Sequence, residues 1–107
     1  MVKLQNENER LVATIYGEID HHSARELRDE IDANLQRSLP KQLVLDFRDV
    51  GFMDSSGVGL IMGRYKLVKS MGGEIIIRNA PDQVARVMRL AGLDRLAQIR
   101  DSDGQKQ

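Results

Sequence analysis

The chain has 107 residues, 16 Lys and Arg against 16 Asp and Glu, and no cysteine. This length suits one domain, and the lack of cysteine excludes disulfides, thiolate metal sites and cysteine nucleophiles. Zero net charge and only two Tyr and two Phe argue against direct binding of nucleic acid, which needs a basic excess and stacking side chains. The sequence has neither an apolar run of about 20 residues nor a signal-peptide start, so we expect a cytoplasmic protein without membrane contact.

The first half of the chain predicts a strand followed by a helix. Residues 11–16 (LVATIY) are rich in β-branched side chains and predict a strand, with residues 2–4 as a short edge partner. Ser23 and Glu26 have the spacing of a capping box, which predicts a helix that begins at Ser23. Pro40 is expected to stop that helix.

The second half continues the alternation of strands and helices. It predicts, in order, a strand at 43–47, a helix from Ser56 to Met71 closed by two glycines, a strand at 74–78, a helix from Pro81 to Gly92, and a short strand at 96–99. The polar tail 101–107 is expected to be frayed. This alternation is typical of a single α/β domain, spanning 1–107, with a mainly parallel sheet and right-handed crossovers.

The stretch FMDSSGVGL at 52–60 is the most informative part of the sequence. It follows a buried strand and opens a helix, whose N-terminus presents unpaired amides that attract anions. Asp54, Ser55 and Ser56 all carry capping oxygens, although a single cap would suffice, so a hydroxyl is left over at the electropositive end. An over-supplied N-cap is the plain alternative to a functional role.

The helix after this stretch has one apolar side and one bare side. Gly59, Gly63 and Lys66 share the bare side, in the direction of Ser55 and Ser56. A mid-helix glycine costs about 1 kcal/mol relative to alanine, so two of them on an exposed face lower stability with no gain in folding. Such a face suits close approach by another protein, or else tight packing under a neighbouring loop.

Catalytic motifs are incomplete. Gly57, Gly59 and Gly63 come near the dinucleotide-binding pattern, but no acidic residue closes a second strand at the expected distance. No phosphate-binding loop or nucleophile elbow is present, and no spacing supports a triad built on Ser55 and Asp54. We therefore expect no catalytic residues and no cofactor.

Residues 17–22 (GEIDHH) form the second conspicuous stretch. His21 and His22 beside acids suggest a metal site, but adjacent side chains on extended backbone point apart, which favours a polar loop and no metal. Loops that follow parallel strands share one edge of the sheet, where ligands and partners bind. We therefore expect Asp20 and His21 to lie beside the stretch 54–56.

Taken together, GEIDHHSARELR at 17–28 and FMDSSGVGLIMGRYK at 52–66 resemble the anti-sigma factor antagonists, founding members of the STAS domain family. The resemblance covers about residues 8–100, and its most specific element is the pattern D-S-[ST]-G-x-G. The flanking DHH and GRYK resemble the sporulation antagonist of the anti-sigma-F kinase more than the general-stress antagonists.

The resemblance implies a switch protein and not an enzyme. In such proteins the anti-sigma factor, an ATP-dependent serine kinase, phosphorylates the serine after the aspartate, which here is Ser55. The unphosphorylated form binds the kinase and frees the sigma factor, here sigma-F, and a PP2C-type phosphatase restores it. The implied fold is a small, mostly parallel sheet of four or five strands with helices on one side.

We expect the partner to contact the two conspicuous stretches and the bare helix side, namely Asp20, His21, Asp54, Ser56, Gly57, Gly59, Gly63 and Lys66. Two alternative functions would use the same helix N-terminus in a different way. The chain could be a module that binds a nucleotide or another small ligand, or a scaffold subunit of a larger signalling complex.

Overall fold

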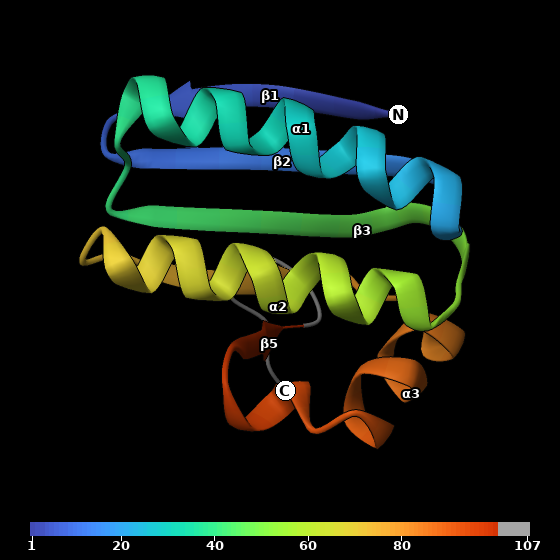
Figure 1. Ribbon diagram of the computed structural model, residues 1–107. Coiled ribbons are helices and arrows are strands. Elements are labelled where there is room, and N and C mark those ends of the chain that lie inside the picture. Colours follow the sequence, from blue (N-terminus) through green and yellow to red (C-terminus); the bar gives the residue numbers. More distant parts are fainter. Residues whose placement is uncertain (101–107) are drawn as a thin grey trace.

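The computed structural model describes residues 1–100, so the tail 101–107, which we expected to be frayed, lies outside the described residues. Within residues 1–100 an initial hairpin is followed by alternating helices and strands (Figure 1). The elements are β1 (Val2–Glu7), β2 (Arg10–Ile19), α1 (His21–Ser38), β3 (Gln42–Met53), α2 (Ser55–Ser70), β4 (Glu74–Arg78), α3 (Asp82–Leu90), the 3-10 turn η1 (Leu93–Arg95) and β5 (Gln98–Arg100).

The strands form one mixed sheet in the order β1-β2-β3-β4-β5. Strand β1 is antiparallel to β2, and every other neighbouring pair is parallel. Because the crossovers all proceed in one direction along the sheet, right-handed connections place the helices on one face. Figure 1 shows α1 and α2 side by side across that face. The expected α/β fold, a mostly parallel sheet with helices on one side, is confirmed.

The core lies between this face and the helices. Alternate strand residues point inward and meet the apolar stripes of the three helices. The fully or almost fully buried side chains include Leu11, Ile15, Leu43, Leu45, Phe47 and Ile77 from the strands, Leu27, Ile31 and Leu35 from α1, Ile61 and Val68 from α2, and Val84 and Met88 from α3. Among the described residues, no helix is both long and apolar enough to cross a membrane.

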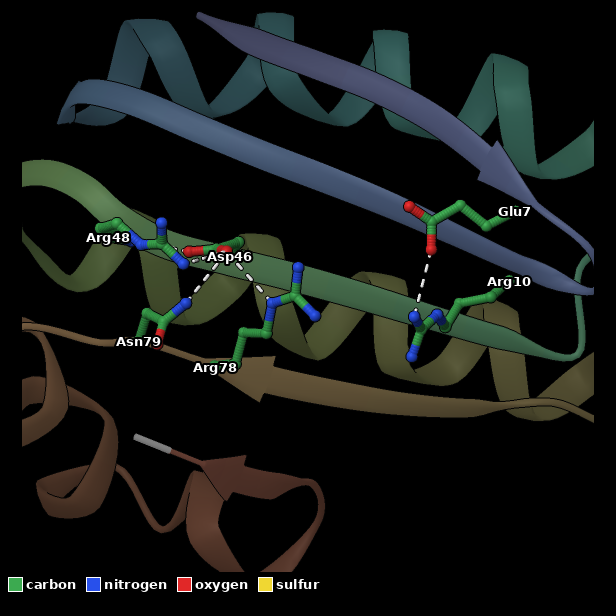
Figure 2. Close-up of polar contacts among 6 residues, drawn as sticks. All are labelled: Glu7, Arg10, Asp46, Arg48, Arg78 and Asn79. Atoms are coloured by element: carbon green, nitrogen blue, oxygen red, sulfur yellow. Dashed lines mark hydrogen bonds and ion pairs between the residues drawn. The ribbon is translucent and has the colours of Figure 1, made fainter. Parts of the chain in front are cut away.

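The opposite face of the sheet carries charged side chains that are paired with one another (Figure 2). Asp46 is only 3% exposed. Its carboxylate accepts hydrogen bonds from Arg78 Nε at 3.1 Å, Asn79 Nδ2 at 3.1 Å and the backbone N–H of Arg48 at 3.0 Å. Nearer the hairpin, Arg10 Nη2 donates to Glu7 Oε1 at 3.1 Å. The buried Asp46 carboxylate needs such partners to offset its lost hydration, whereas the exposed Arg10–Glu7 pair contributes little to stability.

Residues 17–22 are not the polar loop that we expected. Gly17 to Ile19 continue β2, Asp20 is the N-cap of α1, and His21 is already helical. Ser23 is therefore the third helical residue and not the cap. It still belongs to a capping box, but its partner is Asp20 and not Glu26.

Other element boundaries also differ from the sequence-based expectations. Strand β3 extends beyond 47 to Met53, because shifts in its register with β2 return Val50 and Met53 to the core. Helix α2 begins one residue earlier than expected, at Ser55. The last strand begins later, at Gln98, because η1 occupies the chain before it, whereas the strand Glu74–Arg78 is confirmed.

Candidate functional site

The N-termini of α1 and α2 lie side by side at the carboxyl edge of the sheet. Strands β2 and β3 are parallel neighbours that pair up to Ile19 and Met53, and a capping aspartate follows each of them. The backbone N–H of Asp54 donates to the carbonyl of Ile19 at 3.2 Å, which ties the two connections together. The structure thus places Asp20 and His21 next to the stretch 54–56, as expected.

Asp54 is the N-cap of α2, so the Ser55 side chain is not used to cap the helix. Asp54 Oδ1 accepts from the backbone N–H of Ser56 at 2.8 Å, and its carbonyl accepts from Gly57 at 3.0 Å. Ser55 is the first helical residue, exposed, and its hydroxyl makes no hydrogen bond within residues 1–100. The spare hydroxyl at the electropositive helix end is therefore that of Ser55, while Ser56 is half-buried.

The cap of α1 is held by a reciprocal pair of hydrogen bonds. Asp20 Oδ1 accepts from the backbone N–H of Ser23 at 2.9 Å, and Ser23 Oγ accepts from the backbone N–H of Asp20 at 2.9 Å. The Ser23 N–H is the main reason why the pKa of Asp20 lies below its usual value. Asp20 and Asp54 therefore place two capping carboxylates at this edge of the sheet.

The two histidines occupy the first turn of α1. His22 Nε2 lies 3.3 Å from Glu26 Oε2 on the exposed side of the helix. His21 instead lines a groove between α1 and α2. Within residues 1–100, no three His, Asp or Glu side chains gather closely enough to hold a metal ion.

The groove between α1 and α2 has a volume of about 390 Å³. It is lined by His21, Ala24, Arg25 and Arg28 from α1 and by Ser56, Gly59, Leu60, Gly63 and Arg64 from α2. A Cβ atom added at Gly59 or Gly63 would meet nothing within 4 Å, so neither glycine is packed under a loop. Lys66 is exposed on the same helix but does not line the groove.

Gly57 is placed differently from the other residues that we expected to contact a partner. It is buried, and a Cβ atom there would overlap with Cγ and Sδ of Met53. Met53 itself is fully buried in the core. The lack of a side chain at Gly57 therefore serves packing between the end of β3 and α2, and this residue is not part of the exposed surface.

Comparison with known proteins identifies the family. The family model described as "STAS domain" matches residues 1–105. The chain belongs to the STAS domain family. It is 33% identical over 102 residues to the "Anti-sigma F factor antagonist" of Paenibacillus polymyxa, a match that covers 95% of this chain and 87% of the relative. It is also 34% identical over 95 residues to the "Anti-sigma-B factor antagonist" of Bacillus subtilis (strain 168), covering 89% of this chain and 84% of the relative.

Solved structures agree with this assignment of the STAS domain. The anti-sigma factor antagonist SpoIIAA in its unphosphorylated form superposes with a TM-score of 0.81 at 29% identity, covering 92% of this chain and 87% of that chain. The Bacillus SpoIIAA in its phosphorylated form gives a TM-score of 0.73 at 28% identity, covering 92% and 90%. The resemblance to anti-sigma factor antagonists is thus confirmed.

An ion pair between a buried arginine and a half-buried aspartate joins the two helices of this STAS domain, and it was not expected from the sequence. Arg64 Nε lies 2.7 Å from Asp32 Oδ1, and Arg64 Nη1 donates to the Leu60 carbonyl at 3.3 Å. The Arg64 side chain is 8% exposed and that of Asp32 25%. Arg64 lies on the same helix side as the buried Leu60 and Val68, so helical periodicity was the signal that could have revealed its burial.

Burial works against the charged forms of both partners. Burial raises the pKa of Asp32 and lowers that of Arg64, and their mutual attraction offsets these shifts only in part. The pKa of Asp32 is higher in the folded than in the unfolded state, so the ionised carboxylate lowers the free energy of unfolding. This destabilisation decreases as the pH falls through the folded-state pKa. We therefore expect the pair to contribute little to the free energy of unfolding.

The double variant Asp32→Leu/Arg64→Met is accordingly expected to be at least as stable as the parent at neutral pH. Apolar side chains of similar size remove the cost of burying two charges while they still fill the space between the helices. Urea denaturation measures the free energy of unfolding, with the single variant Arg64→Met as the control that leaves Asp32 without its partner. A loss of about 3 kcal/mol or more in the double variant would contradict this view of the pair.

Proposed function

We propose that this STAS domain is the phosphorylation-controlled component of a partner switch. Unphosphorylated, it binds an anti-sigma factor that is also a serine kinase, and so releases a sigma factor in the cytoplasm. Phosphorylation of Ser55 ends this binding, and a PP2C-type phosphatase restores it. The chain itself performs no catalysis in this role.

One observation carries the proposal: Ser55 offers an exposed, unbonded hydroxyl at the first position of a helix that Asp54 already caps. A kinase can reach this hydroxyl without breaking a hydrogen bond of the described fold. The two relatives that are antagonists of anti-sigma factors support the role. Their identities of 33% and 34% are nearly equal, so we base the assignment to sigma-F on the DHH and GRYK flanks.

The chemistry of the site supports a switch without refolding. A phosphate on Ser55 adds about 1.5 to 2 negative charges, which the helix N-terminus tolerates. Asp54 and Asp20 repel it, so they do not form a clamp within the domain. The phosphate would therefore act on the partner. SpoIIAA exists in both an unphosphorylated and a phosphorylated form, which supports a fold compatible with both states.

The proposed contact surface is the sheet edge beside Ser55, the groove, and the exposed Lys66 farther along α2. It consists of Asp20, His21, Asp54, Ser56, Gly59, Gly63 and Lys66. These residues belong to the two helix starts and to the bare side of α2 that follows. Gly57 is left out because it is buried against Met53.

Mass spectrometry of the chain after incubation with its anti-sigma factor kinase and ATP tests the proposal. The expected product carries a single phosphoryl group on Ser55, which a PP2C-type phosphatase removes. A phosphoryl group on Ser56 would move the site by one residue. No phosphorylation by a kinase that is active on another antagonist would contradict the proposal.

Alanine at Gly59 or Gly63 is expected to raise stability and to weaken binding of the anti-sigma factor. Neither added methyl group meets another atom, and alanine is the better helix former by about 1 kcal/mol. The same methyl groups would, however, stand between α2 and a closely approaching partner. Thermal melting and calorimetric titration measure the two effects. A higher melting temperature with unchanged affinity would remove the glycines from the contact surface.

A further inference from the structure

The groove between α1 and α2 concentrates positive charge in a chain that has none in excess. Three arginines and one histidine line it, with no Asp or Glu, although Lys and Arg equal Asp and Glu in number over the whole chain. The hollow of similar volume at the opposite end of the sheet is mixed, with Glu7, Glu9 and Glu74 beside Arg10 and Lys41. The basic character is therefore local to the groove beside Ser55.

The groove arginines differ in how far their charge is already paired. Arg28 Nη2 lies 3.1 Å from Asp29, and Arg64 Nε lies 2.7 Å from Asp32; neither acid lines the groove. Arg25 is exposed and has no ion pair within residues 1–100. Arg25 is thus the cation most available to a negatively charged partner group.

The shape of the groove allows a polypeptide to come close. Gly59 and Gly63 contribute no side chain, and beyond the helix's own backbone no atom lies within 4 Å of where their Cβ atoms would stand. We infer that this groove receives an acidic segment of the anti-sigma factor, with Arg25 and Arg28 meeting its carboxylates. The inference rests on the proposed function and adds the chemistry of the partner to it. Charge complementarity is the argument for this occupant.

This occupant gives phosphorylation a direct effect on binding. Ser56 lines the groove, and Ser55 is its neighbour in the chain. A phosphate on Ser55 would add negative charge at the groove's end and so repel the acidic segment. It would also reduce the positive potential of Arg25 toward that segment, so both effects weaken the complex.

Charge reversal at Arg25 tests the inference. Arg25→Glu in the full chain is expected to bind the anti-sigma factor about tenfold more weakly at low salt, and to lose much of the parent's salt dependence. The matched control is Arg86→Glu, which makes the same charge change at an exposed position on α3. Circular dichroism melting of both variants shows whether either change disturbs folding.

The outcomes separate this inference from the proposed function. Equal binding by Arg25→Glu and Arg86→Glu, with the parent bound normally, would overturn the acidic occupant and leave the switch intact. Failure of the parent to bind or be phosphorylated would overturn the switch itself. A second test combines Arg25→Glu with anti-sigma factor variants in which one surface carboxylate is changed to lysine. Restored binding by one of these pairs would support the inference, and no restored binding by any of them would count against it. If ATP or GTP bound to the parent and not to Arg25→Glu, the occupant of the groove would be a nucleotide and not an acidic segment of the anti-sigma factor.

Discussion

Replacing Ser55 with alanine is expected to abolish phosphorylation while the affinity for the anti-sigma factor stays close to that of the parent. The Asp54 carboxylate still accepts from the Ser56 N–H, and the lost hydroxyl makes no hydrogen bond within the described residues, so stability should change by about 1 kcal/mol or less. The variant should hold the anti-sigma factor even with ATP present. Phosphate incorporation and pull-down from the same reaction measure both effects.

Two related variants control this result. Ser56→Ala should still be phosphorylated, because Ser55 remains exposed and Asp54 still caps the helix. Ser55→Asp supplies one charge and less bulk than phosphate, so it should weaken binding only in part. Stoichiometric phosphorylation of the Ser55→Ala variant would instead show that Ser56 is the modified residue.

Gly57→Ala is expected to destabilise the domain by about 1–3 kcal/mol, the usual cost of overpacking. The added methyl group would overlap with Cγ and Sδ of Met53, a fully buried side chain that would have to shift within the core. For a domain of this size each kcal/mol lowers the melting temperature by roughly 4–8 °C. Gly59→Ala, two residues along the same helix and in open space, is the matched control and should gain stability.

A double-variant cycle shows whether Met53 is the cause. Met53→Ala leaves a cavity that the new methyl group partly fills, so Met53→Ala/Gly57→Ala should cost less than the sum of the single changes. If the stability losses of the two single variants simply added in the double variant, Met53 would not be the cause of the loss in Gly57→Ala. Unchanged stability of Gly57→Ala would show that glycine is not needed for packing here.

Local patterns were enough to predict the architecture. The alternation of β-branched runs with helical periodicity predicted the parallel sheet, and residues 74–78 match a strand to the residue because that run is short and its ends are clear. Capping chemistry was harder to assign, since Asp20 and Ser23 are both good N-caps. Only the end of β2 at Ile19 decides between them, and that depends on pairing with β3.

The site shows a similar limit. Helical periodicity placed Gly59 and Gly63 on the exposed side of α2, but it could not distinguish Gly57, which meets a side chain from the preceding strand. The groove and the Arg64–Asp32 pair arise between two helices about thirty residues apart in the chain, so no local pattern contains them. Arg25 belongs to the groove only because α1 packs beside α2, which no local sequence pattern indicates.

We expect phosphorylation of Ser55 to change the surface locally and to leave the fold unchanged. Amide chemical shifts of the domain, recorded before and after stoichiometric phosphorylation, test this expectation. Large shift changes are expected at residues 53–60 and smaller ones across the groove at 20–28, with β4 and α3 almost unaffected. Changes in β4 and α3 as large as those at 53–60 would contradict it.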